Sequence, residues 1–308
     1  MSKNVRAHIA LFIVALIYGG NYSVAKLVLD DNYIQPLGFI VMRAMSGLVL
    51  FWIAHLMFIR EDVDKKDFPL IIVCAIFGIA VNQMFFFMGL KYTTPINASL
   101  IMTTTPILVL LTSAIIVKEK ITIQKMIGIA FGAIGAIVLI SFGKELSFNQ
   151  SQILGDVMIL INAISYGIYL VLVKKLMTRY HPITVIKWIF TIGIFMVLPF
   201  GIGDLKAVQW TDFNQTIWLA VIYVLIGATF LTYLLNAFAL KVVNASVVSI
   251  YIYLQPLLAT LIALLMGKDE LGFVKILAAI FIFIGVYLVS APSKQPPNKT
   301  SKSHKISK

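Results

Sequence analysis

Ten long apolar runs constrain this chain more than any other feature of its sequence. Each is close to the roughly 20 residues that a helix needs to cross a bilayer. The chain is 60% hydrophobic and 12% charged, whereas soluble domains have about 45–50% apolar and roughly 25% charged residues. We therefore predict an all-α polytopic membrane protein with ten transmembrane helices. Their expected positions are 8–29, 35–59, 68–90, 96–117, 125–142, 154–173, 183–202, 215–239, 244–266 and 272–290.

The positive charges predict how these helices are oriented. Lys and Arg number 25 against 13 Asp and Glu, and cytoplasmic loops of membrane proteins carry an excess of Lys and Arg. If the N-terminus lies in the cytoplasm, the outer loops carry only Lys91, Lys144, Lys206, Lys268 and Lys275. We therefore expect a multi-pass protein of the cytoplasmic cell membrane with both termini in the cytoplasm.

The same charges bear on the partners of the chain. No basic helix with interleaved aromatic residues lies outside the apolar runs, so nucleic acid is not an expected partner. Membrane lipids and a small-molecule substrate are expected, and a homo-oligomer stays open. Residues 292–308 contain Pro, Ser and Lys but no acidic residue. Such a segment buries little apolar area, and we expect a disordered basic cytoplasmic tail.

The two halves of the chain share one pattern. A segment starting at Gly89 aligns without gaps with one starting at Ala239, "GLKYTTPINASLIMTTTPILVLLTSAIIVKEK" against "ALKVVNASVVSIYIYLQPLLATLIALLMGKDE". In this register Pro106 meets Pro256, and the acidic Glu119 meets Asp269. The agreement of a proline and an acidic helix end in one register indicates an internal repeat.

The repeat unit predicts the topology. Five helices form an odd number, so the second copy has to cross the membrane in the opposite sense. We predict two inverted five-helix repeats, residues 1–143 and 154–291, joined by a polar linker, residues 144–153. Inverted repeats are typical of secondary transporters, which bind substrate near the midplane between the repeats.

The order of these motifs resembles the EamA branch of the drug/metabolite transporter superfamily. The motif A-x-x-Y-G occurs in the first helix of each half, at Ala15–Gly19 and Ala163–Gly167, and an acidic residue closes each fourth helix. The resemblance covers about 8–290 and implies ten helices, cytoplasmic termini and a central cavity. It also implies that small metabolites cross the membrane, with export as the expected direction.

Hydrogen-bonding side chains inside the apolar runs predict where a substrate binds. A polar group facing lipid has no partner, so such residues face other helices or a cavity. Amide, hydroxyl and aromatic groups suit a small amphipathic solute, and interhelical hydrogen bonding is the alternative role of each residue. The candidate substrate-binding residues are Tyr18, Asn21, Asn82, Gln83, Tyr166, Tyr169, Asn236, Tyr253 and Gln255.

Two prolines and two cations complete the candidate site. Pro106 and Pro256 each remove the amide that would bond the carbonyl four residues earlier, which predicts a pair of bends that serve either gating or packing. Arg43 is the deepest charge, and both carboxylate binding and a clamp on backbone carbonyls remain open roles. Lys26 lies near the end of its helix and can reach the interface.

Other function classes find little support in the sequence. The histidines fall at helix ends or in the tail, Cys74 is the only cysteine, and no HExxH or GxSxG motif occurs, so we expect no enzyme, metal or cofactor. No segment resembles the filter of a channel. The expected function is a carrier that moves an amino acid or related amphipathic metabolite by alternating access. Uptake or exchange of another solute, or a channel, are the alternatives.

Overall fold

The computed structural model describes residues 2–30, 33–141, 150–265 and 272–291, and all regular structure in these ranges is helical. Ten helical stretches of these ranges are long and apolar enough to span a membrane, which confirms the predicted fold class. Most of the predicted linker, the acidic end at Asp269 and the predicted tail lie outside the described residues.

Several of the ten spans consist of more than one helical element. The third comprises η1 to α4, the fourth α5 and α6, the eighth α10 to α11, and the ninth α12 to α13. In chain order the elements are α1 (Lys3–Asp30), α2 (Pro36–Phe58), η1 (Lys65–Asp67), α3 (Phe68–Ala75), η2 (Ile76–Ala80), α4 (Val81–Tyr92), α5 (Pro95–Met102), α6 (Thr105–Ile116), α7 (Ile123–Ser141), α8 (Gln150–Met177), α9 (Pro182–Lys206), η3 (Trp210–Asp212), α10 (Gln215–Ile222), η4 (Tyr223–Leu231), α11 (Thr232–Val242), α12 (Ala245–Ile250), η5 (Tyr251–Tyr253), α13 (Leu254–Leu265) and α14 (Phe273–Ser290).

Local sequence signals start these helices. Pro36 and Pro182 open α2 and α9, where the missing proline amide costs nothing because the first turn has no acceptor for it. The Thr94 hydroxyl caps α5 by accepting from the backbone N–H of Asn97 at 3.1 Å, and Asn214 caps α10 in the same way. These caps satisfy amides that hydrocarbon would leave without a partner.

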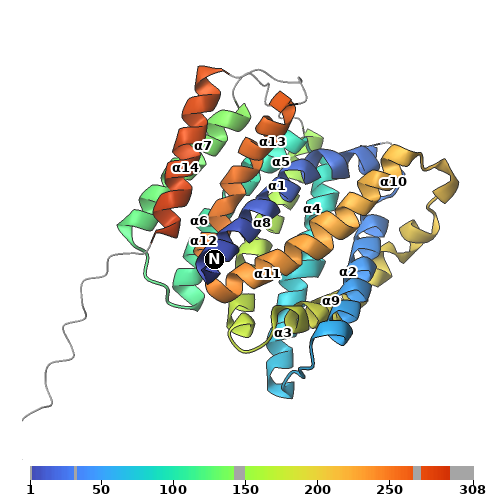
Figure 1. The fold of residues 1–308 in the computed structure, drawn as a ribbon. Coiled ribbons are helices and arrows are strands. Elements are labelled where there is room, and N and C mark those ends of the chain that lie inside the picture. The colour runs from blue at the N-terminus through green and yellow to red at the C-terminus, as the bar shows by residue number, and fades with distance from the viewer. Residues whose placement is uncertain (1, 31–32, 142–149, 266–271, 292–308) are drawn as a thin grey trace, which may run out of the picture.

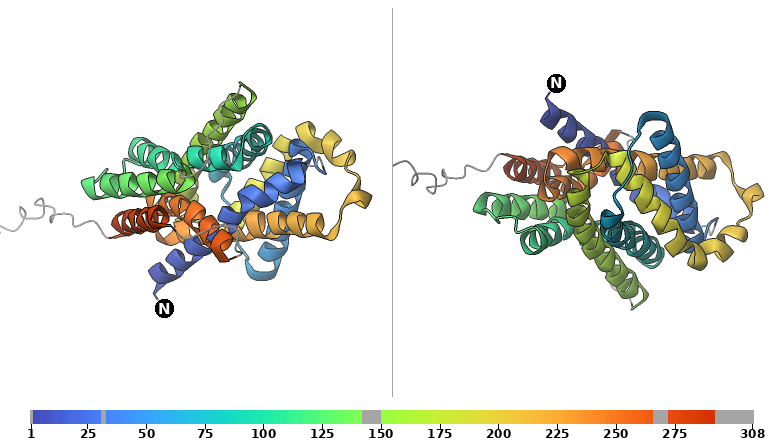
Figure 2. Two further views of the ribbon diagram at one scale, coloured as in Figure 1. Left: turned by 90° about the horizontal axis from the view of Figure 1, so that it is seen from above. Right: turned by 90° about the horizontal axis from the view of Figure 1, so that it is seen from below.

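The helices form a central group with a pair of helices at each edge. Figure 1 shows α7 beside α14 at one edge and α2 beside α9 at the other, with α1, α4, α8 and α11 between them. The two views in Figure 2 keep the same pairs together. The N-terminal end of α1 lies near the junction of α11 and α12 (Figure 1). We call the face where α1 begins the amino-terminal face, and the face where α1 ends the opposite face.

Small residues pack α7 against α14 in a reciprocal way. A Cβ on Gly285 would lie 2.6 Å from the carbonyl oxygen of Gly128, and a Cβ on Gly135 would lie 2.7 Å from that of Ala278. In the gapless alignment Gly128 matches Ala278 and Gly135 matches Gly285, so one contact becomes the other when the halves are exchanged. A two-fold relation produces contacts of this kind, in agreement with the predicted inverted repeats.

The helix breaks precede the two prolines. The fourth span breaks after Met102, and Pro106 lies at the start of α6; the ninth breaks at η5, just before Pro256. In the first break the hydroxyls of Thr103 and Thr104 donate to backbone carbonyls, at 2.6 and 2.7 Å. The same two carbonyls also accept from the backbone amides of Thr103 and Thr104, so the break is a tight turn that the hydroxyls reinforce.

Candidate functional site

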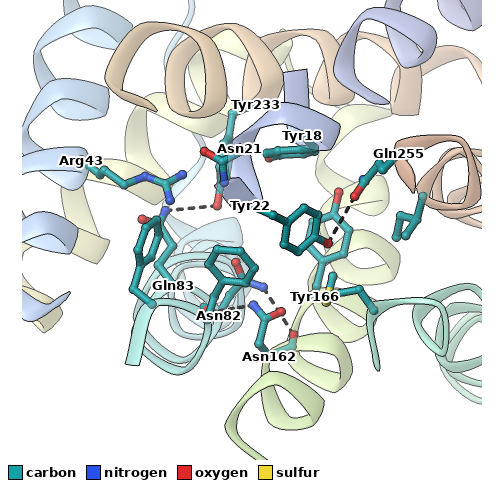
Figure 3. Close-up of a pocket in the computed structure, with 14 residues that line it drawn as sticks. Tyr18, Asn21, Tyr22, Arg43, Asn82, Gln83, Asn162, Tyr166, Tyr233 and Gln255 are labelled. Atoms are coloured by element: carbon teal, nitrogen blue, oxygen red, sulfur yellow. Dashed lines mark hydrogen bonds between the residues drawn. The ribbon is translucent and has the colours of Figure 1, made fainter. Parts of the chain in front are cut away.

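A polar cavity lies at the centre of the bundle, where α1, α2, α4, α8 and α11 meet the broken spans. It leaves about 80 Å³ for the centres of water-sized molecules, and about 10–15 Å³ on this measure holds one water. Several waters, or the polar end of a small solute, therefore fit (Figure 3). The lining residues are Tyr18, Asn21, Tyr22, Arg43, Asn82, Gln83, Phe86, Phe87, Met102, Asn162, Tyr166, Tyr233, Ile252 and Gln255.

Arg43 brings the one formal charge to this lining, among the residues that the structure describes. It lies on α2, and only 4% of it is exposed. Its Nε donates to the Thr229 hydroxyl at 2.8 Å and its Nη2 donates to the carbonyl of Ala228 at 3.1 Å. The guanidinium carbon lies 4.7 Å from the centre of the Phe87 ring, close enough for a cation–π interaction.

Two π-helical segments supply the carbonyls that hold the lining in place. They are η2 in the third span and η4 in the eighth. The Tyr233 hydroxyl donates to the carbonyl of Gly78 in η2 at 2.7 Å, whereas the Ala228 carbonyl in η4 accepts from Arg43. A π-helical turn loosens the regular bonding pattern and is frequent at functional sites. Here it lets side chains from neighbouring spans bond the backbone.

Amide side chains connect the spans around the cavity. Asn162 Nδ2 donates to the carbonyl of Asn82 at 2.7 Å, and Asn82 Nδ2 donates back to the carbonyl of Asn162 at 3.4 Å. Gln83 Nε2 donates to the Tyr233 hydroxyl at 3.2 Å. These bonds tie α4 to α8 and α11 and fix the orientation of the amides that line the cavity.

Toward the opposite face, a hydrogen-bonded side-chain pair borders the cavity. The Tyr22 hydroxyl donates to Gln255 Oε1 at 3.3 Å. Both residues also line a second cavity, of about 240 Å³, which reaches Pro95 on the fourth span and Thr260 on the ninth. The Tyr22–Gln255 pair therefore lies between two cavities.

Toward the amino-terminal face, aromatic and hydroxyl groups make contacts beside the cavity. The Thr232 hydroxyl bonds that of Tyr18 at 3.1 Å, and His8 Nδ1 lies 2.7 Å from the hydroxyl of Tyr251. A space of only about 10 Å³ remains between these contacts. Contacts between α1 and the eighth and ninth spans therefore lie on both sides of the central cavity.

The comparisons with known proteins agree with this architecture. The profile of the EamA-like transporter family matches residues 5–141 and again residues 153–291. The chain belongs to the EamA-like transporter family. This confirms the resemblance seen in the sequence, and the protein is a multi-pass membrane transporter.

Relatives of this EamA-like transporter are named as uncharacterized transporters. An uncharacterized transporter of Archaeoglobus fulgidus is 26% identical over 295 residues, covering 95% of this chain and 100% of the relative. The uncharacterized transporter YyaM of Bacillus subtilis is 24% identical and covers 99% of this chain and 100% of its own. One solved crystal structure has a TM-score of 0.72 at 18% identity, covering 92% of this chain and 95% of that one. It shares the fold.

Most of the candidate site residues come together in this EamA-like transporter. The structure places seven of them in the lining of the central cavity: Tyr18, Asn21, Arg43, Asn82, Gln83, Tyr166 and Gln255. The prolines lie at the helix breaks, outside this lining. Lys26 lies at the opposite face, where its Nζ donates to the carbonyls of Leu90 and Thr93 at 2.8 and 3.2 Å. It caps the end of α4.

Three candidates lie away from the central cavity. The rings of Tyr169 and Tyr253 pack where glycines leave room: a Cβ would lie 2.5 Å from Tyr169 at Gly78 and 2.3 Å from Tyr253 at Gly132. Asn236 lines the small space toward the amino-terminal face. These positions give the two tyrosines packing contacts in place of the predicted cavity lining.

Several lining residues were not among the candidates. Tyr22, Asn162 and Tyr233 are polar residues within predicted spans, so the same polar signal covers them. Phe86 and Phe87 are apolar and give no signal, because aromatic residues are common in spans that face only lipid or other helices. Among the described residues, no group of three or more His, Cys, Asp or Glu could hold a metal ion.

Proposed function

We propose that the protein is a secondary carrier that moves a small amphipathic metabolite, such as an amino acid, across the cytoplasmic membrane. The observation that carries this proposal is the polar cavity at the centre of the bundle, which is lined by both halves of the chain. No filter-like ring of charges or carbonyls is found among the described residues that line it, as a channel would need. A carrier needs a site that is reached from each side in turn.

The aromatic and amide lining supports a small amphipathic solute. Tyr18, Tyr22, Phe86 and Tyr166 offer apolar faces, and the amides of the lining offer hydrogen bonds. Such mixtures of aromatic walls and a few polar groups are typical of sites for small organic molecules. The solute is expected to place its apolar part against the rings.

Alternating access is the mechanism that we propose, with rocking of two inverted repeats. The reciprocal glycine contacts between α7 and α14 support the two-fold relation on which it depends. The Tyr22–Gln255 pair would open toward the opposite face, and the contacts of Tyr18 and Tyr251 would open toward the amino-terminal face. The bends at Pro106 and Pro256 lie in the spans that border these closures.

Counterflow in proteoliposomes tests the carrier. Vesicles loaded with an unlabelled amino acid or amphipathic metabolite should accumulate the labelled compound faster than empty vesicles, and the initial rate should saturate. A flux that rises linearly with concentration, with no stimulation from the other side, would show a channel instead. Tyr166→Ala should reduce the rate, whereas Tyr287→Ala, on a residue 71% exposed on α14, should leave it unchanged.

The direction and orientation that we propose are export, with both termini in the cytoplasm. The charge distribution of the loops supports the orientation, and the family resemblance supports the direction. Reporter fusions at the C-terminus that are active only in the cytoplasm test the first. Cells that overproduce the carrier should release a preloaded substrate faster than control cells, and faster uptake without release would contradict export.

A further inference from the structure

Arg43 places a permanent positive charge at the wall of the central cavity. Arginine is not deprotonated in proteins, and a buried cation is costly unless a charge, hydrogen bonds or water stabilise it. No Asp or Glu is among the described residues that line this cavity. The hydrogen-bond acceptors found for Arg43 are neutral, one hydroxyl and one carbonyl. Its charge therefore lacks a counter-charge in the lining.

The guanidinium group also has unused donors. It has five N–H groups, and the structure shows one bond from Nε and one from Nη2. One face of the group stacks over Phe87, and the Nε–Nη2 edge bonds η4, so the edge formed by Nη1 and the second N–H of Nη2 remains for a ligand. That edge matches two oxygens of a carboxylate, which is the arrangement that arginine binds best.

A purely structural role explains only part of this geometry. Arg43 does hold η4 through Thr229 and Ala228, but these bonds use only Nε and one N–H of Nη2, so they leave the other N–H groups without a structural role. Asn21 lines the same cavity, is 4% exposed and has an Oδ1 atom without a partner among the described residues. Gln83 and Asn162 in the same lining also have a side-chain oxygen without a partner among the described residues, so the wall offers acceptors for donor groups of a solute as well as the Arg43 charge.

We propose that the central cavity selects solutes that carry a carboxylate or a similar anionic group, held at the edge of Arg43, over cations of the same shape. This inference rests on the proposed function, since it names the substrate class of the same cavity. The aromatic residues bind the body of the solute, and Asn21 accepts a hydrogen bond from a donor group of that solute where one is present.

A matched series of probes tests the charge preference. The compounds 3-phenylpropionate, L-phenylalanine, 3-phenylpropanamide and phenethylamine share one body and carry an anion, a zwitterion, no charge and a cation. The corresponding isobutyl series tests a smaller body. Thermal unfolding of the purified full-length protein gives apparent affinities, and the carboxylate probes should stabilise it most. Equal or greater stabilisation by amines, or none by any carboxylate up to millimolar concentration, would overturn the proposal.

Variants of Arg43 separate binding from folding. Arg43→Gln should weaken the carboxylate probes by roughly ten- to one-hundred-fold and remove the preference over the amides, and Arg43→Lys should keep the preference with lower affinity. Thr229→Val removes one acceptor of Arg43 but keeps the charge, so it should weaken carboxylates less than Arg43→Gln does. If Arg43→Gln and Thr229→Val each weaken the binding of all probes by the same factor, Arg43 only supports the fold and the proposal is wrong.

The experiments distinguish failure of the proposed charge preference from failure of the proposed carrier function. Counterflow that is saturable but prefers the amines would refute the charge selection and leave the carrier intact. Carboxylate binding that depends on Arg43, without counterflow of any bound compound, would refute the carrier and leave the anion site intact.

Discussion

Replacing Gly201 with alanine should weaken the packing of α2 on α9, whereas the same change at Gly203 should not. A Cβ at Gly201 would lie 2.2 Å from the carbonyl oxygen of Leu37 and 2.7 Å from Cγ2 of Val41. The nearest atom belongs to the backbone, so a change of rotamer cannot relieve the overlap. At Gly203, on the same helix, nothing lies within 4 Å of the added Cβ.

The expected change in the free energy of unfolding is the sum of two opposing contributions. Forcing an extra methyl group into a packed contact costs about 1–3 kcal/mol, and alanine gains up to about 1 kcal/mol over glycine inside a helix. The expected net loss for Gly201→Ala is about 1–2 kcal/mol, which corresponds to a factor of roughly 5–30 in the ratio of open to closed protein. Gly203→Ala has only the favourable term.

Cys74 offers a direct assay, since it is the only cysteine of the chain and is fully buried. A maleimide can label it only after the protein opens. When opening and closing are fast relative to labelling, the labelling rate follows the open population. Labelling of Gly201→Ala should be roughly 5–30 times faster than labelling of the wild type, and Gly203→Ala should match or fall below the wild-type rate. Equal rates for both variants would refute the packing argument.

Three further changes test the closures and the helix ends. Tyr22→Phe removes the bond to Gln255, worth about 0.5–1.5 kcal/mol, and should speed amide hydrogen exchange at the start of α13 about two- to tenfold. Lys174→Met leaves carbonyls at the end of α11 unsatisfied and should lower the unfolding free energy by about 1–3 kcal/mol; the exposed Lys175→Met is the control, with tryptophan fluorescence on heating as the readout. Burial lowers the pKa of His181 from 6.5, so the unfolded chain takes up the proton first as pH falls. Stability should therefore be fully present above about pH 6.5 and decrease below it, and His181→Asn should flatten this dependence; an unchanged profile would contradict the argument.

The number and type of the spans could be predicted because a bilayer allows few alternatives. Hydrocarbon offers no hydrogen bonds, so an apolar run of sufficient length has to satisfy its own backbone as a helix. Helix starts such as Pro36 and Pro182 are equally local signals. The breaks before Pro106 and Pro256 follow from the missing proline amides, and for this reason they were predictable as well.

The π-helical segments had no such signal. Nothing in the sequence of η2 or η4 distinguishes them from the rest of their spans, because the groups that bond their carbonyls come from other helices. Arg43 reaches Ala228 from α2, and Tyr233 reaches Gly78 from α11. Such bonds depend on the tertiary arrangement, which one sequence does not reveal.

The candidate site could be predicted in composition but only partly by residue. Helical spacing puts Tyr166 and Tyr169 on one side of α8, yet only Tyr166 lines the cavity. The ring of Tyr169 packs on Gly78 instead. Which polar residue faces the cavity is decided by the shape of the neighbouring helix, and that shape is set by contacts between distant parts of the chain.

The central cavity lies where the two halves of the chain are related by the predicted two-fold axis, but its one charge, among the described residues, comes from one half only. Gln83 and Tyr233 bond each other and are 150 positions apart, the register in which Pro106 meets Pro256. Two residues related by a two-fold axis can touch only near that axis, so the predicted inversion puts the axis at this cavity. Arg43 has no such counterpart, because the residue at the matching distance from the start of α9 is Ile189. Duplication therefore accounts for walls that come from both halves, whereas the charge comes from α2 alone. Because Arg43 bonds η4 in the other half, any rocking of the halves has to break these bonds or carry α2 and η4 together.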